Sequence, residues 1–233
     1  MLTILYRIYQ LLVVLPLGLL ATLLTALSTS LGCMLGNGNF WSYWPGRLWG
    51  IVMCRLCLFP VHVEGRENIK PGQSYIFMSN HQGAFDIFLI YGFLRRPFKW
   101  MMKKSLRKVP FVGYACEKAD FIFVDNSSPA AVQQTMDQAR EILRDGMSLM
   151  IFPEGTRTKT GEVGRFKKGG FILAQEVGLP IIPITLDGPF QVLPVKKGFS
   201  FVKWHPLTMK IHPAVEAGDE AMEKVRQKII NNK

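Results

Sequence analysis

Two short stretches of the chain contain side chains suited to proton transfer and phosphate binding. The first reads Asn80-His81-Gln82-Gly83-Ala84-Phe85-Asp86. A histidine can accept a proton near neutral pH, and a carboxylate bonded to its other ring nitrogen fixes the tautomer and stabilises the imidazolium. His81 and Asp86 are five residues apart and do not face each other on one regular helix. They can pair if His81 precedes a helix and Asp86 lies in its first turn. On spacing alone, an unpaired loop histidine beside a helix-start carboxylate is the simpler interpretation.

The second stretch reads Phe152-Pro153-Glu154-Gly155-Thr156-Arg157. Gly155 lets the backbone approach a ligand closely, and Arg157 offers a planar fork of donors that suits phosphate. Further basic residues follow at Arg165, Lys167 and Lys168. The stretch therefore suits an anion, and a solvated basic loop is the alternative interpretation.

Short apolar runs alternate with helical patterns from about residue 61 onward. Five runs read as strands, at residues 75–78, 121–124, 148–152, 180–186 and 209–212. Helices are expected after Ser128-Pro129, a good N-cap and first helical residue, and around residues 171–177 and 220–230. Continuous apolar strands fit a sheet covered on both faces, so the alternation predicts an α/β fold. Both stretches follow predicted strands, at the end where open α/β sheets bind ligands.

An apolar segment precedes this pattern. Residues 11–31 carry no charge and are long enough to cross a bilayer. The run at residues 48–59 contains Arg55 and is too short to span with confidence. Two interpretations stay open: a spanning hairpin with both ends in the cytoplasm, as the positive-inside rule favours, or two helices lying in the interface. A cleaved signal peptide is less favoured because the run is long.

Charge and hydropathy fit a membrane surface. The chain has 233 residues, a mean hydropathy of +0.16 and a formal net charge of +11, with no charged residue between Arg7 and Arg47. Basic residues near an anionic leaflet contribute about 1 kcal/mol each. Nucleic acid is not expected, because no nucleic-acid signature accompanies the basic charge. Cys54 and Cys57 lie in an apolar run without a second pair, which predicts buried thiols, and no metal site is predicted.

The two stretches together resemble the acylglycerol-phosphate acyltransferase family, whose bacterial members are 1-acyl-glycerol-3-phosphate acyltransferases. Three further segments fit the family's order and spacing. They are Lys104-Ser105-Leu106 followed by Pro110, Phe111 and Gly113; Phe166-Lys167-Lys168-Gly169; and Ile182-Pro183-Ile184. The apolar N-terminal segments also resemble those of bacterial members. The resemblance implies an acyltransferase-type sheet flanked by helices, with residues 1–60 as a membrane-associating helical hairpin and residues 61–233 as the catalytic domain.

The resemblance also implies the reaction. A fatty acyl thioester of coenzyme A or acyl carrier protein is the co-substrate, and the acceptor is the 2-hydroxyl of lysophosphatidic acid. No other cofactor is expected. His81 is then the general base and Asp86 orients it. Such an enzyme works at the cytoplasmic face of the inner membrane and makes phosphatidic acid for phospholipid biosynthesis.

Substrate-binding roles follow for the residues around this pair. Arg157 is expected to hold the acceptor phosphate with Lys104 and Lys167, and Glu154 to position Arg157 or the acceptor. Backbone amides near Gly155, together with Asn80, are candidates for stabilising the oxyanion. Thr156 belongs to the same substrate-binding stretch.

One departure from the family pattern keeps other functions open. A Phe-Ile-Asp-Arg-like run is common in the family, whereas this chain reads Phe123-Val124-Asp125-Asn126. Asn126 cannot replace an arginine's charge, so another lysolipid, such as lyso-ornithine lipid, is the alternative acceptor. A thioester hydrolase and a non-catalytic lipid-binding protein are further alternatives. Neither chain-length preference nor oligomeric state follows from the sequence.

Overall fold

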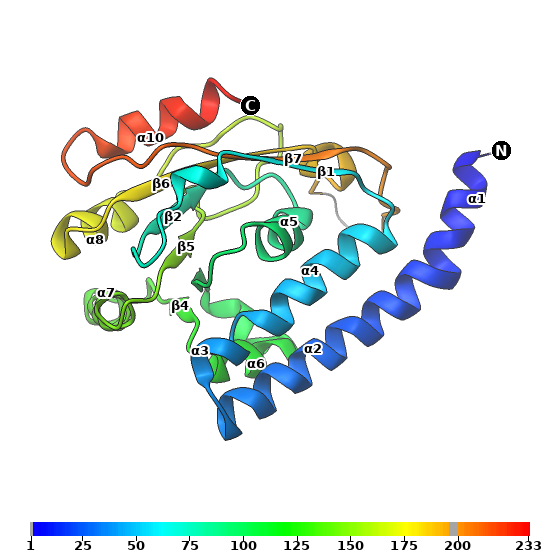
Figure 1. Ribbon diagram of the computed structural model, residues 1–233, viewed down its shortest axis with the longest axis horizontal. Coiled ribbons are helices and arrows are strands. Elements are labelled where there is room, and N and C mark those ends of the chain that lie inside the picture. The colour runs from blue at the N-terminus through cyan, green and yellow to red at the C-terminus, as the bar shows by residue number, and fades with distance from the viewer. Residues whose placement is uncertain (1, 196–199) are drawn as a thin grey trace.

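The computed structural model describes residues 2–195 and 200–233 and is built around one mixed sheet (Figure 1). Within these residues the sheet has seven strands in the order β1-β7-β6-β2-β5-β3-β4. The strands are β1 Val61–Glu64, β2 Ile76–Ser79, β3 Lys99–Lys103, β4 Ile122–Val124, β5 Leu149–Ile151, β6 Ile181–Asp187 and β7 Leu207–Ile211. Strands β6, β2, β5, β3 and β4 run parallel, β7 is antiparallel to β6, and β1 is parallel to β7. The predicted α/β class is confirmed.

Helices cover both faces of the sheet, as the continuous apolar strands predict. On one face, α5 (Phe85–Phe93) packs beside α4 (Trp44–Leu56) and shares a buried core with β2 and β6. On the other face lie α7 (Pro129–Arg144), α8 (Gly169–Val177) and α10 (Ala221–Ile230). The shorter helices are α3 (Gly38–Trp41), α6 (Val112–Lys118) and α9 (Pro189–Val192), with 3-10 turns η2 at Arg66–Asn68 and η3 at Lys104–Lys108.

The five predicted strands and three predicted helices are present within one to two residues, whereas β1 and β3 were missed. Ser128 caps α7 as expected, accepting a hydrogen bond from the Ala131 amide. Strand β3 reads KWMMK, and its lysines hide the apolar pattern. The first of them, Lys99, is buried and donates to the Ser42 hydroxyl and the Ala119 carbonyl. Burying a charged lysine is unfavourable unless it finds hydrogen-bond partners. Ser42 and Ala119, which are distant in the sequence, provide them for Lys99.

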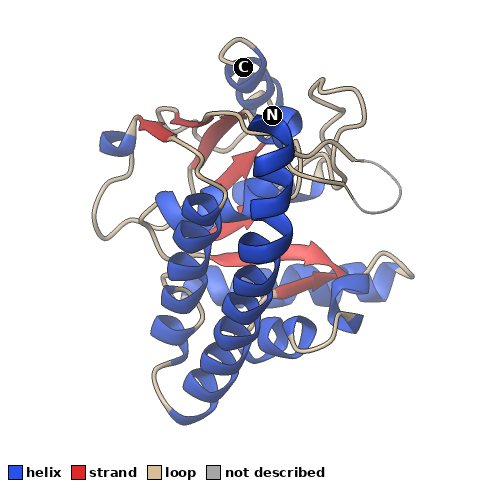
Figure 2. Cartoon of the chain, turned by 90° about the vertical axis from the view of Figure 1, so that its right-hand side faces the viewer, coloured by secondary structure: helices blue, strands red, loops and turns tan. Residues whose placement is uncertain are grey.

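The N-terminal segment forms one continuous helix that packs against α4 (Figures 1 and 2). It comprises α1 (Leu2–Tyr9), a π-helical stretch (Gln10–Val14) and α2 (Leu15–Leu35). In the described part of the chain, this helix is the one that is long and apolar enough to cross a membrane. Close approach of α4 to α5 depends on Gly50, where a β-carbon would lie 2.5 Å from the Phe88 carbonyl oxygen.

Helix α4 also belongs to the core of the sheet domain. Its Cys54 and the following Cys57 are free, buried thiols, as predicted, and they cluster with Phe77 and Leu89 of β2 and α5. The N-terminal helix, which packs against α4, and α4 itself therefore hold a fixed position beside the sheet. The division of the chain at residue 60 stays a prediction.

Candidate active site

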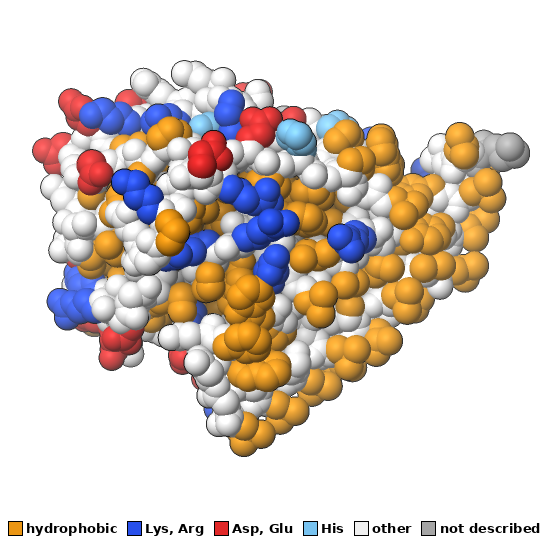
Figure 3. Space-filling model, in the orientation of Figure 1, with side chains coloured by type: hydrophobic (Ala, Val, Ile, Leu, Met, Phe, Trp, Pro, Cys, Tyr) orange, Lys and Arg blue, Asp and Glu red, His pale blue; other side chains and the backbone are white. Residues whose placement is uncertain are grey.

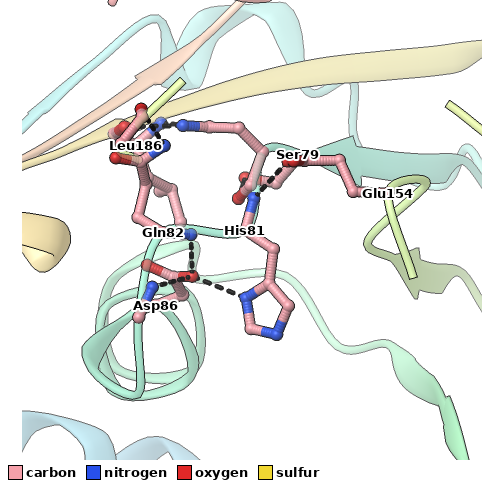
Figure 4. A network of polar contacts seen from close by, with 9 residues as sticks. Ser79, His81, Gln82, Asp86, Glu154 and Leu186 are labelled. Carbon is pink, nitrogen blue, oxygen red and sulfur yellow. Dashed lines mark hydrogen bonds and ion pairs between the residues drawn. The ribbon is translucent and has the colours of Figure 1, made fainter. Parts of the chain in front are cut away.

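His81 and Asp86 meet in the connection between β2 and α5. His81 lies in the loop after the strand and Asp86 in the first turn of the helix, so the five-residue spacing brings the side chains together. The His81 Nδ1 atom lies 2.7 Å from Asp86 Oδ2 (Figure 4). The same carboxylate oxygen accepts the backbone amides of Gln82 at 2.6 Å and Gly83 at 2.9 Å. Two backbone amides thereby hold this carboxylate oxygen against the imidazole.

The environment of the pair suits a proton acceptor. Asp86 is fully buried, and burial raises the pKa of its carboxyl group, while the hydrogen bonds from His81, Gly83 and Gln82 act in the opposite direction. The His81 side chain remains 16% exposed. Its Nε2 atom makes no hydrogen bond to any described residue and points away from Asp86 (Figure 4). An Nδ1–H bonded to Asp86 leaves Nε2 with a lone pair that can accept a substrate proton.

Two stacked aromatic rings support the imidazole of His81. The Phe152 ring stacks on His81 with 3.9 Å between centroids and 7° between planes, and Trp100 stacks on Phe152 at 5.6 Å. Stacking restrains the ring that Asp86 orients. Sequence reasoning missed both aromatic residues, although Phe152 is the first residue of the motif that ends at Arg157.

The Asn80 side chain joins two strands of the sheet. Its side chain is fully buried, donates to the Leu186 carbonyl at 2.9 Å and accepts from the Leu186 amide at 2.8 Å. The amide group thus joins the end of β2 to β6. Both its oxygen and its nitrogen bond to backbone, which gives Asn80 a positioning role, and its part in stabilising an oxyanion stays a prediction.

Glu154 also bonds to backbone. Its Oε1 accepts the His81 amide at 2.8 Å and its Oε2 accepts the Gly164 amide at 2.7 Å. Burial raises the pKa of this carboxyl group, and the two amide hydrogen bonds oppose the shift. Among the described residues Glu154 makes no ion pair with Arg157; it joins the two motifs and holds the His81 backbone. Its predicted contact with the acceptor stays a prediction. The Thr158 amide bonds to the His81 carbonyl at 2.9 Å and completes this link.

The glycine of the second motif lies beside a lysine. Gly155 has φ +69°, a conformation that side chains disfavour, and a β-carbon there would lie 2.9 Å from Lys167 Nζ. Thr156 and Arg157 follow it and are exposed. Lys167 and Arg157 therefore present cationic groups near the loop that Glu154 ties to His81.

Lys104 lies farther along the same edge of the sheet. It follows β3, whose neighbour β5 precedes the second motif. Its Nζ pairs with Asp125 Oδ2 at 2.5 Å, a partner that sequence reasoning missed. Asp125 precedes Asn126, at the departure from the family pattern. Of the cations predicted for phosphate, Lys104 thus already has a carboxylate partner, whereas no carboxylate pairs with Arg157 or Lys167 among the described residues.

All these groups lie where parallel strands end, so the fold and site define an α/β protein with a histidine–carboxylate pair next to a cationic loop. No group of three or more histidine, cysteine or carboxylate side chains is placed to hold a metal within the described part of the chain. Residues 60–187 match the family model described as Acyltransferase, and the chain belongs to that family. The resemblance inferred from the motifs is confirmed.

Known proteins with similar sequence or structure include plant and bacterial enzymes. A 1-acyl-sn-glycerol-3-phosphate acyltransferase of Limnanthes douglasii is 33% identical over 193 residues, covering 78% of this chain and 67% of that protein. The enzyme of that name from Pseudomonas aeruginosa is 40% identical over 124 residues, 53% of this chain and 48% of its own length. The crystal structure of the 1-acyl-sn-glycerophosphate acyltransferase PlsC from Thermotoga maritima matches with a TM-score of 0.79 at 26% identity, over 97% of this chain and 95% of that one.

The matched region is only part of several relatives. It spans 38% of the chloroplastic enzyme LPAT1 of Arabidopsis thaliana, at 32% identity over 58% of this chain. In the Chlamydomonas reinhardtii relative it spans 53%.

Proposed function

We propose that this protein transfers a fatty acyl group from a thioester to the 2-hydroxyl of lysophosphatidic acid, giving phosphatidic acid. The observation that carries the proposal is the 2.7 Å contact between His81 Nδ1 and a buried Asp86 carboxylate, beside the loop of Gly155 and Lys167. Curated relatives bear the name of this activity, and the carrier in the thioester is either coenzyme A or acyl carrier protein.

The residues support a direct transfer. His81 Nε2 accepts the proton of the acceptor hydroxyl while that oxygen attacks the thioester carbonyl, and Asp86 stabilises the resulting imidazolium. The tetrahedral intermediate collapses by breaking the carbon–sulfur bond, and the proton on His81 passes to the leaving thiolate. General-base catalysis of this kind contributes about 10²–10⁴-fold. Backbone amides near Gly155, together with Asn80, are the candidates for stabilising the oxyanion.

Cations near the base support a phosphorylated acceptor. Arg157 supplies a fork of donors and Lys167 a point charge next to the backbone of Gly155. Lys104 is partly neutralised by Asp125, so we assign it a smaller share of phosphate binding. Asn126 keeps lyso-ornithine lipid as the second candidate acceptor.

An acceptor panel tests this assignment. We expect Arg157→Ala to lower kcat/KM for lysophosphatidic acid about 10–100-fold, because a charge-assisted bond to phosphate contributes about 1.5–3 kcal/mol. Turnover of a monoacylglycerol should change little. Arg144→Ala, which removes an exposed arginine of α7, is the matched control. An equal loss with both acceptors would contradict phosphate binding, and preferential use of lyso-ornithine lipid by the wild type would favour the second candidate.

We further propose that the N-terminal helices lie in one leaflet at the cytoplasmic face. The helix Leu2–Leu35 has 34 residues, so at about 1.5 Å per residue it is about 50 Å long, more than the about 30 Å of hydrocarbon. The protein body accompanies it at both ends: Tyr6 donates to the Cys57 carbonyl, and Tyr114 contacts Met34. Crossing the bilayer would carry this body into hydrocarbon.

Exposed leucines at helical spacing line the outer face of that helix, which forms the apolar lower right edge of the molecule in Figure 3. Labelling with a membrane-impermeant thiol reagent tests its orientation, using Thr3→Cys and Asn39→Cys in sealed vesicles of both orientations. Each variant also carries Cys33→Ser and Cys116→Ser to remove the partly exposed thiols at these two positions. We expect both positions to react only from the cytoplasmic side. Labelling of the two positions from opposite sides would show a spanning helix.

A further inference from the structure

Four arginines gather at the edge of the sheet opposite His81. The chain leaves β2 at the His81 edge, returns through α5, and enters the parallel strand β3 from the other edge. Arg95 and Arg96 lie on this return, Arg66 lies in η2, and Arg47 lies in the first turn of α4. In the view of Figure 3, basic side chains gather in the centre of the molecule, over α4 and between α4 and the sheet. The cluster is therefore separate from the proposed catalytic site.

Protein carboxylates do not compensate these charges. No carboxylate pairs with any of the four arginines among residues 2–195 and 200–233. Burial, followed by the nearby charges of Arg95 and Arg47, lowers the pKa of the Arg66 guanidinium. Like charges held together at a partly buried position disfavour one another unless an anion neutralises them.

Two of the guanidinium groups have donors in need of an acceptor. The Nε–H groups of Arg47 and Arg66 are buried and have no hydrogen-bond partner among the described residues. Leaving a buried donor unpaired is costly, so such groups call for an explanation. Protein contacts already orient both side chains. Arg66 donates an Nη2–H to the Phe93 carbonyl at 2.9 Å, and the Arg47 guanidinium lies 5.0 Å from the Trp44 ring.

The cluster is bordered by exposed apolar side chains. Phe40, Trp44 and Leu48 are 47%, 39% and 64% exposed, and the Phe40 and Trp44 rings are 5.9 Å apart. Tryptophan favours the headgroup level of a bilayer. These residues belong to the same helical hairpin as the apolar helix Leu2–Leu35. Guanidinium groups next to exposed aromatic and aliphatic side chains suit a ligand that carries both a phosphate and acyl chains.

We propose that Arg47, Arg66 and Arg95 bind the phosphate of an anionic membrane phospholipid, whose chains lie along Trp44 and Leu48. Arginine presents a planar donor fork that binds phosphate oxygens in pairs. The lipid at this site is a structural ligand and is not consumed, so the inference does not depend on acyl transfer. A free phosphate would satisfy the guanidinium groups and leave the exposed tryptophan and leucine without a role, which favours the lipid.

Thermal unfolding of the full chain in a neutral detergent tests the site. The probes are dihexanoyl-phosphatidylglycerol, dihexanoyl-phosphatidylcholine and inorganic phosphate. A ligand that binds only the folded protein raises the midpoint of unfolding. We expect phosphatidylglycerol to raise the midpoint in a saturable way and to do so far more than the other two probes. A similar rise with phosphatidylcholine, or with inorganic phosphate, would overturn the assignment to an anionic lipid.

Substitutions of single arginines test whether phosphatidylglycerol binds at the arginine cluster. Arg47→Gln and Arg66→Gln should weaken phosphatidylglycerol binding about tenfold or more, because each loses a charge-assisted hydrogen bond. Arg144→Gln, with the same loss of charge on α7, and Arg157→Ala, at the proposed catalytic site, should bind like the wild type. Arg47→Lys keeps the positive charge and serves as a second variant in case the glutamine variants fold poorly. It should still bind phosphatidylglycerol more weakly than the wild type, because lysine lacks the planar donor fork of arginine. Unchanged affinity in both Arg47 variants, or a loss confined to Arg157→Ala, would overturn the proposal.

Discussion

His81→Ala is expected to lower kcat for acyl transfer about 10²–10⁴-fold, the usual contribution of a general base. The substitution removes the one ring nitrogen that is directed away from Asp86 and has no partner among the described residues. The KM for lysophosphatidic acid should change little, because the cations assigned to the phosphate remain. Steady-state kinetics with a labelled acyl thioester measures both quantities.

The fold should survive this substitution. The backbone of His81 provides its links to Glu154 and Thr158, and alanine keeps both hydrogen bonds. Circular dichroism and the midpoint of thermal unfolding check that expectation. His62→Ala is the control, since His62 is exposed and, within residues 2–195 and 200–233, pairs only with Glu64, at 3.4 Å. Near-normal turnover by the His81 variant would exclude the proposed base and, with it, the proposed mechanism.

Asp86→Asn is expected to lower kcat by a similar factor, about 10²–10⁴-fold, while largely preserving the fold. An asparagine oxygen can still accept the amides of Gln82 and Gly83, which now bond to Asp86 Oδ2 at 2.6 and 2.9 Å. The same oxygen still faces His81 Nδ1, and the NH₂ group takes the place of Oδ1, which has no hydrogen-bond partner among the described residues. The neutral amide lacks the negative charge that stabilises the imidazolium formed when Nε2 accepts the substrate proton.

A second variant separates this loss of charge from loss of structure. Asp86→Ala leaves two buried amides without an acceptor, at a cost of about 1–3 kcal/mol each, so it should unfold at a lower temperature than Asp86→Asn. The comparison of kcat and unfolding midpoint for the two variants is the measurement. An Asp86→Asn protein as active as the wild type would show that the carboxylate only shapes the loop.

The local sequence predicts most of the elements near the site. The strands before His81 and Glu154 are continuous apolar runs, and Ser128-Pro129 marks the start of α7, because these signals depend on residues close together in the chain. Strand β3 was missed because Lys99 is compensated by Ser42 and Ala119, which are distant in sequence. A local pattern carries no information on such a partner.

The composition and motifs by themselves determined the α/β class, the acyltransferase family, the apolar N-terminal segment and the pairing candidates His81 and Asp86. Only the tertiary structure decided what the polar residues around the pair do. Asn80 bonds to Leu186, and Glu154 to His81 and Gly164, although residue type alone suits either for contact with a substrate. The physical reason is that burial obliges a polar group to find a partner, and which backbone group comes within 3 Å depends on how β2, β5 and β6 pack.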